Sequence, residues 1–170
     1  VRFVEKDVNF NFCGFNITPF EVPHDGTDNV GYHIEVGGTI FCFVTDLGHI
    51  TEKVSSYIEK ANYLILEANY DEEMLKGGHY PKFLKERITS PLGHLSNKTT
   101  AKFLAEHITE DLKYVWLCHL SGENNHPELA YKTVEYELRG VGVIPDVDVQ
   151  VTALKRNSPS ELYEFEISEY

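Results

Sequence analysis

A short apolar run from Thr39 to Thr45 constrains the fold of this 170-residue chain more than any other stretch. Its seven residues are β-branched, aromatic or cysteine and carry no charge, which is typical of a strand buried in a sheet. Asp46 and Gly48 follow at once, before a helix-like segment. A carboxylate at the carboxyl end of a buried strand lies where open α/β sheets place their sites. The alternative interpretation is that Asp46 only caps the next helix.

The pattern on either side of Asp46 predicts a mixed sheet. Before it, apolar and polar residues alternate, with candidate hairpin turns at Gly14 and at Gly37-Gly38, so antiparallel strands are expected. After it, strands alternate with helices. We therefore expect an α/β chain of the α+β type, with helices on one face of the sheet and a bare opposite face that something else must cover. Expected strands after Asp46 span residues 63–68, 114–118 and 147–154, and expected helices span 51–60, 71–75, 81–88, 96–107 and 127–138.

Charge and cysteine content narrow the class of protein. A net charge of −12 argues against broad attraction to nucleic acid or anionic membranes, although it leaves room for a local basic cleft. Cys13, Cys42 and Cys118 are odd in number and far apart, which favours reduced core residues of a cytosolic protein. The chain shows neither a charged leader before an apolar run nor an apolar segment of about 18 residues. We therefore expect a cytoplasmic location and no membrane contact.

Three residues at expected strand ends suit a metal ion. His24 closes a strand that contains Phe20 and Val22, and His119 ends the strand at 114–118, as Asp46 ends its own. Side chains from different strand ends can converge on one ion, and two histidines with one aspartate suit zinc or manganese. The alternative is that His24 is an ordinary surface loop residue.

Glu67 and His94 are the candidates for catalysis. Glu67 ends the 63–68 strand, where a buried charge needs a partner and can orient a histidine by accepting its ring N–H. His94 precedes a helix capped by Ser96 or Asn97, and backbone N–H groups at such a terminus favour an anion such as phosphate. A histidine there suits general acid catalysis. The alternative is that Ser96 is merely a cap and His94 has no role.

The chain resembles the second half of a metallo-β-lactamase-fold hydrolase over about residues 8–140. Within that fold it is most similar to the YycJ/WalJ-like group of DNA exonucleases, with ribonuclease Z more distant. The resemblance is carried, in this order, by Pro-His24-Asp-Gly-Thr-Asp-Asn, Thr-Asp46-Leu-Gly-His, Leu-Glu67-Ala-Asn, Gly-His94-Leu-Ser-Asn and His119-Leu-Ser-Gly-Glu-Asn-Asn.

The resemblance also implies an incomplete domain. The family signature HxHxDH, which supplies most of the metal ligands, does not occur in the 170 residues. We expect residues 1–154 to be the C-terminal part of an αββα sandwich and residues 155–170 to be an acidic tail. The N-terminal half of the same protein, or a partner chain, would then cover the bare face of the sheet.

The resemblance assigns roles to the candidate residues. His24, Asp46 and His119 would bind metal, with Asp46 bridging two divalent ions, zinc or manganese, of which this chain holds only partial sites. His94 would act near the scissile phosphate, supported by Glu67. Expected substrate contacts are Ser96, Asn97, Asn124 and Asn125, together with Lys82 and Lys85, which lie near His94 in sequence along with Arg87 and Lys98. The alternative for the lysines is a solvated helix face.

Metal-dependent phosphodiester hydrolysis, exonuclease-like and acting on DNA, is thus the expected function. Two alternatives stay open. One is a hydrolase of the same fold that acts on a small ester, lactone or thioester. The other is a metal-free binding or assembly module, in which the bare sheet face is the interaction surface.

Overall fold

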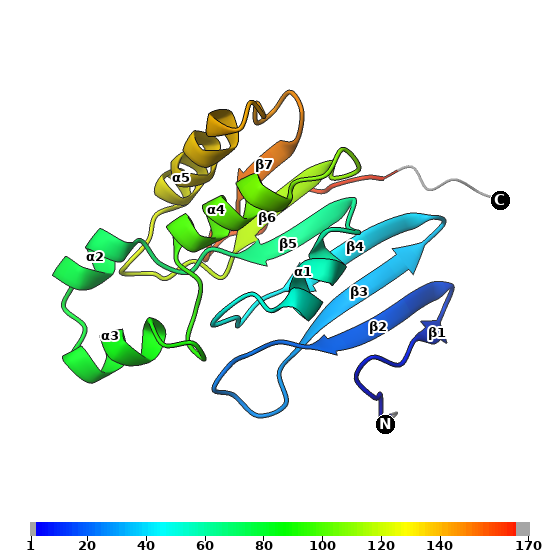
Figure 1. Ribbon diagram of the computed structural model, residues 1–170, viewed down its shortest axis with the longest axis horizontal. Coiled ribbons are helices and arrows are strands. Elements are labelled where there is room, and N and C mark those ends of the chain that lie inside the picture. The colour runs from blue at the N-terminus through cyan, green and yellow to red at the C-terminus, as the bar shows by residue number, and fades with distance from the viewer. Residues whose placement is uncertain (1–2, 166–170) are drawn as a thin grey trace.

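The computed structural model describes residues 3–165, which form one seven-stranded mixed sheet with helices on one face (Figure 1). The strands lie side by side in the order of the sequence. Pairing is antiparallel from β1 to β4 and parallel from β4 to β7. The strands are β1 (Phe10–Phe12), β2 (Phe15–Glu21), β3 (Val30–Val36), β4 (Thr39–Val44), β5 (Tyr63–Glu67), β6 (Tyr114–Cys118) and β7 (Gln150–Ala153).

Two tight turns connect the antiparallel strands. Cys13 and Gly14 join β1 to β2 with φ angles of 50° and 88°, and Gly37 and Gly38 join β3 to β4 with 53° and 73°. Positive φ at both central residues gives a two-residue turn whose twist matches that of the flanking strands. The hairpins predicted at these glycines are confirmed.

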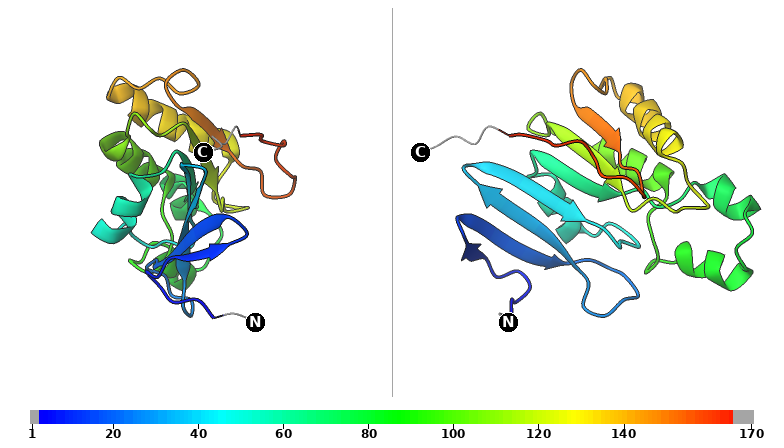
Figure 2. Two further views of the ribbon diagram at one scale, coloured as in Figure 1. Left: turned by 90° about the vertical axis from the view of Figure 1, so that its right-hand side faces the viewer. Right: turned by 180° about the vertical axis from the view of Figure 1, so that it is seen from behind.

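Helices connect the parallel strands, and three of them, α1, α4 and α5, cover one face of the sheet (Figures 1 and 2). Thr51 and Ser96 begin α1 and α4 by accepting hydrogen bonds from the backbone N–H groups of Val54 and Thr99. Among the described residues, no helix has the length and hydrophobicity that a bilayer crossing requires. The helices are α1 (Glu52–Ile58), α2 (Glu72–Gly77), α3 (Lys82–Ile88), α4 (Asn97–His107) and α5 (Pro127–Gly140).

The hydrophobic core lies between the sheet and these three helices. Leu64 and Leu66 of β5 and Leu117 of β6 are fully buried there, in one cluster with Val54 of α1 and Ala101 of α4. Because side chains alternate between the two faces of a strand, this burial fixes the register of β5 and β6. It thereby fixes where the polar residues at their ends must lie.

The end of the described chain crosses the opposite face of the sheet (Figure 2), where aromatic side chains lie. The ring of Phe165 lies 4.4 Å from that of Tyr63, and the ring of Tyr163 lies 4.9 Å from that of Trp116. Among the described residues, the helices that pack on the sheet all lie on the face away from these rings. The predicted arrangement, with helices on one face, is confirmed. The predicted tail covers part of the other face over residues 155–165, and residues 166–170 lie outside the described residues.

Candidate metal centre

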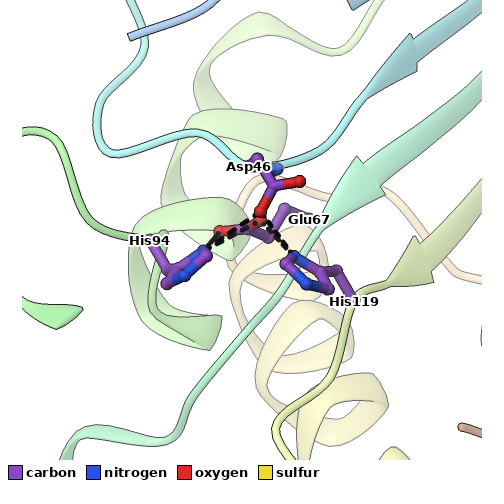
Figure 3. A group of neighbouring side chains, drawn as sticks. All are labelled: Asp46, Glu67, His94 and His119. Atoms are coloured by element: carbon purple, nitrogen blue, oxygen red, sulfur yellow. Dashed lines mark hydrogen bonds and ion pairs between the residues drawn. The ribbon is translucent and has the colours of Figure 1, made fainter. Parts of the chain in front are cut away.

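Neighbouring parallel strands bring polar side chains together at their carboxyl ends (Figure 3). Asp46 follows β4, Glu67 ends β5 and His119 follows β6, while His94 reaches them from the loop before α4. Each of the four offers one potential ligand atom, and these atoms lie within 4.8 Å of one another. We call Asp46, Glu67, His94 and His119 the strand-end cluster. The cluster follows from parallel topology, because the ends of adjacent parallel strands meet at one edge.

Asp46 and His119 both adopt a left-handed backbone conformation, with φ of 54° and 56°. This conformation is uncommon for residues other than glycine and is tolerated where the surroundings enforce it. The backbone N–H of Asp46 donates to Glu67 Oε2 at 2.7 Å, which holds the turn after β4 against the end of β5. The conformation aims both side chains at the same point beyond the sheet.

Glu67 organises the cluster. Its side chain is fully buried, and its carboxylate accepts hydrogen bonds from the backbone N–H groups of Asp46 and Leu95. The two histidine rings approach the same carboxylate through their Nδ1 atoms, at 3.1 Å for His94 and 2.8 Å for His119. The predicted contact between Glu67 and a nearby histidine is therefore present, and a second histidine shares it.

Electrostatics keep Glu67 ionised at neutral pH. Burial by itself raises the pKa of this carboxyl, but hydrogen bonds from His119 and His94 outweigh burial and hold its pKa below the ordinary value of 4.5. The hydrogen bond to Glu67 likewise raises the pKa of His119 above 6.5. An ionised carboxylate only accepts hydrogen bonds, so both rings donate from Nδ1. The Nε2 atom of His94 is therefore free to face a substrate.

His24 stands beside the cluster and extends it. Its Nδ1 atom lies 2.9 Å from the carbonyl oxygen of Gly93 and donates to it, which turns Nε2 toward the cluster. This Nε2 lies 3.6 Å from Asp46 Oδ1. Two ligands of one tetrahedral zinc ion lie roughly 3.4 Å apart, so the spacing of these two atoms fits a divalent metal ion. His119, whose Nδ1 donates to Glu67, would bind such an ion through Nε2.

Ser96, Asn97 and Asn125 are buried and bonded to other protein groups. Ser96 Oγ caps α4 and donates to Glu72, whereas Asn97 and Asn125 exchange amide hydrogen bonds of 2.8 Å in both directions. Asn124 is also buried. These side chains brace the loops behind the strand-end cluster. The prediction that they contact substrate gains no support from this geometry.

The two predicted substrate lysines lie away from His94. Lys85 Nζ donates to the carbonyl oxygens of Lys76 and Gly78, at 2.8 and 2.7 Å, and so closes the C-terminal end of α2. Lys82 is exposed and pairs with Glu86 at 3.6 Å. Both border a hollow between α2 and α3 that does not include His94. Their role in substrate binding stays a prediction.

A cavity of about 220 Å³ opens beside His94 and brings in an arginine that the sequence did not indicate. Its lining includes His24, Arg87 of α3 and Arg156 of the turn after β7. Arg87 belongs to the basic stretch near His94 that the sequence had suggested. Arg156 lies far along the chain, in a polar segment without pattern, so only the fold reveals that it reaches this site.

Comparison with known proteins identifies the family of this chain. The family model for a beta-lactamase superfamily domain matches residues 1–120. The chain belongs to the beta-lactamase superfamily. Its similar relatives include exodeoxyribonuclease YycJ of Bacillus anthracis, at 35% identity over 134 residues, and exodeoxyribonuclease WalJ of Streptococcus pneumoniae, at 37% over 136 residues. Each match covers 78% of this chain but 51% of the relative, so the chain spans about half the length of these relatives.

Solved structures share the fold of this chain. The metallo-beta-lactamase fold protein YhfI of Bacillus subtilis superposes with a TM-score of 0.64 at 16% identity, covering 89% of this chain and 50% of that one. Zinc-bound PqqB of Methylobacterium extorquens gives 0.56 at 21% identity, covering 94% and 51%. The predicted resemblance to the metallo-β-lactamase fold and to the YycJ/WalJ group is confirmed. At such low sequence identity, these structural matches show a shared fold and nothing further.

Proposed function

We propose that this chain forms the C-terminal part of a metal-dependent exonuclease that acts on DNA. The observation that carries the proposal is the buried Glu67 carboxylate, which holds Asp46, His94 and His119 together with His24 beside them. The exodeoxyribonuclease names of relatives at 35% and 37% identity support the same chemistry. Since those relatives are about twice as long as the match, the activity belongs to the full-length encoded protein.

We infer that the site takes two divalent ions, zinc or manganese. His24 and Asp46 would hold one ion, and Asp46 and His119 would hold the other, because the Asp46 carboxylate lies between the two rings. The remaining ligands would come from outside the 170 residues, in which HxHxDH does not occur. When bound, such ions supply a hydroxide at neutral pH and stabilise charge on a phosphoryl group.

Residues of this chain would position the substrate and move a proton. His94 borders the cavity where a phosphodiester would lie, and it offers Nε2 to the leaving oxygen while Nδ1 stays on Glu67. Glu67 acts as a positioning residue, since it is fully buried and meets the substrate only through the rings that it orients. This division of roles matches the general acid expected of a histidine beside an anion.

A second layer would complete the molecule. The aromatic face of the sheet is covered only in part by Tyr163 and Phe165, and Phe43 on that sheet stays 38% exposed. We propose that the N-terminal half of the same protein, or a partner chain, covers the rest. A cytoplasmic location stays part of the proposal.

Degradation assays on the full-length encoded protein test this function. With manganese or zinc, linear DNA should shorten progressively from its ends, closed circular DNA should stay intact, and chelation should stop the reaction. His94→Ala should lower kcat by about 10²–10⁴-fold, as expected for the loss of a general acid. A thioester substrate provides the comparison: its hydrolysis without any DNA degradation would replace the exonuclease by a small-molecule hydrolase.

A further inference from the structure

We propose that Arg156 binds a phosphate of the substrate next to the one that is cleaved. The site would therefore favour a nucleic acid strand over an isolated phosphodiester. This inference rests on the proposed function and adds a specificity residue to it. Arg156 lies beyond residues 1–120, the part of the chain that the family model matches.

The cavity beside His94 gathers walls from segments that are far apart in sequence. His24 and His94 border it near the strand-end cluster, and Tyr80 and Arg87 border it from the α2–α3 region. Arg156 closes it from the turn that follows β7. The cavity has room for a phosphate group, and it opens directly beside the histidine expected at the scissile bond.

Charge in this cavity is unevenly balanced. Arg87 donates to both carboxylate oxygens of Asp25, with Nη2 at 3.0 Å from Oδ1, and this pairing holds the pKa of Asp25 below its ordinary value. The charges of Arg87 and Asp25 therefore neutralise each other. Arg156 is exposed, and no ion pair or side-chain hydrogen bond joins it to any residue between positions 3 and 165. It is therefore the arginine of the cavity that is available to an anion.

The Arg156 side chain lies against the loop after β6. Its Nη1 atom is 3.6 Å from the position that a Cβ of Gly122 would take, which is an ordinary van der Waals distance. Because the guanidinium lies over this loop and outside the strand-end cluster, we place the phosphate that it meets next to the one at His94.

A positive charge beside the strand-end cluster favours an anionic partner. Arg156 lines the same cavity as His94, and its charge repels a cation bound at Asp46 and His119. An anion that neutralises the guanidinium relieves this repulsion. A polyanionic strand would supply that anion, because its phosphates are evenly spaced along the chain.

Binding measurements on the metal-free, full-length protein test the contact without relying on turnover. A fluorescein-labelled single-stranded deoxyoligonucleotide would be titrated by anisotropy at several salt concentrations. Arg156→Ala should weaken binding about tenfold and reduce the slope of log K against log salt by about 0.7, the value for one phosphate of a single strand. Arg156→Lys should keep most of the slope, since the charge remains.

Arg139→Ala is the matched control. Arg139 pairs with Glu135 on α5, and that helix runs away from the strand ends (Figure 1). This variant should bind like the wild type. If Arg156→Ala keeps the wild-type slope, or if the wild-type protein does not bind the oligonucleotide, the phosphate contact is overturned.

Hydrolysis of two substrates places the contact relative to the scissile bond. Arg156→Ala should raise KM for the oligonucleotide about tenfold and should affect kcat/KM much less for bis(p-nitrophenyl) phosphate, which has a single phosphate. An equal loss on both substrates would put Arg156 at the scissile phosphate and overturn the neighbouring position. If the wild type hydrolyses neither, the proposed function fails, while the anisotropy result still decides the fate of Arg156.

Discussion

Glu67 shows how one buried charge can define a site. A carboxylate taken out of water costs several kcal/mol unless charge-assisted hydrogen bonds replace its hydration. Glu67 receives four such bonds, two from backbone N–H groups and two from the rings of His94 and His119. The donors come from three segments at the edge of the sheet: the turn after β4, the loop before α4 and the turn after β6. The hydrogen bonds that stabilise the buried charge of Glu67 are therefore also the contacts that assemble the site.

Replacing Glu67 by Gln tests this dependence. The amide keeps the shape but turns one acceptor into a donor that faces N–H groups, so at least one of the four bonds is lost. We expect the metal-free protein to lose about 2 kcal/mol of unfolding free energy in urea and metal affinity to fall 10–100-fold. Glu123→Gln, at an exposed loop position, should change neither. Wild-type metal affinity in Glu67→Gln would contradict the positioning role.

Residues of the site differed in how well the sequence revealed them. Asp46 and His119 were predictable, because each directly follows a buried strand whose apolar run stands out. The sequence also suggested that Glu67 orients one histidine, but not that it holds the Asp46 backbone as well. Arg156 carried no signal, since an arginine in a polar turn looks like any surface residue. Contacts between residues that are far apart in the sequence leave no local pattern from which they could be predicted.

At the scale of elements, strands and helices were predictable, whereas the packing of their loops was not. The turns at Gly37-Gly38 and at Gly14 indicated the antiparallel strands, and apolar runs in the sequence indicated the parallel ones. The loop at 91–94, in contrast, packs against the turn after Asp46 through contacts that no pattern encodes. A Cβ atom on Gly48 would lie 2.3 Å from the carbonyl oxygen of Pro91. Such close backbone approaches appear only in three dimensions.

Gly93 offers a test of that loop packing. A Cβ at this position would lie 2.2 Å from the carbonyl oxygen of Ile88, and the Gly93 carbonyl accepts the hydrogen bond that orients His24. Gly93→Ala should therefore cost about 1–3 kcal/mol of unfolding free energy in urea and weaken metal binding at His24. Gly77→Ala is the control, because nothing lies within 4 Å of its Cβ. Equal stability of the two variants would refute the close packing at Gly93.

The junction between α5 and the turn before β7 should respond to alkaline pH. Tyr131 of α5 donates a 2.6 Å hydrogen bond to Asp146, and this bond raises the pKa of Tyr131 to about 12. A raised pKa means that the bond stabilises the fold fully below pH 10, the ordinary tyrosine value, and is lost as pH rises through 12. Tyr131→Phe should therefore be less stable than wild type at pH 8, by about 0.5–1 kcal/mol, and the gap should narrow above pH 10.

Urea unfolding across this pH range checks the prediction. Tyr136→Phe serves as control, since Tyr136 lies on the same helix and is 76% exposed. That variant should follow the wild type at every pH. A gap for Tyr131→Phe that stays constant from pH 8 to 11 would mean that ionisation of this tyrosine is not coupled to folding.

At the scale of the whole molecule, the two faces of the sheet have different partners. The helical face is closed by α1, α4 and α5, and its core is complete within this chain. The other face carries Phe41, Tyr63 and Trp116, whose rings stack along the sheet. Among the described residues, the aromatic rings that cover them from outside the sheet belong to the tail. A domain needs a packed layer on each apolar face of its sheet. The chain, about half the length of its relatives, thus presents one closed face and one open one.

The tail tests how much of that open face this chain covers by itself. Tyr163 and Phe165 lie on the sheet aromatics, whereas Leu162, which precedes Tyr163, is 84% exposed, and Glu164 is exposed as well. Alternate tail residues therefore face inward. Replacing Tyr163 and Phe165 together by Ser removes two aromatic contacts, and should lower the unfolding free energy by about 2–3 kcal/mol in urea. Leu162→Ser should leave it unchanged. Equal stability of both variants would mean that the tail does not pack on this face, and that another layer must cover all of it.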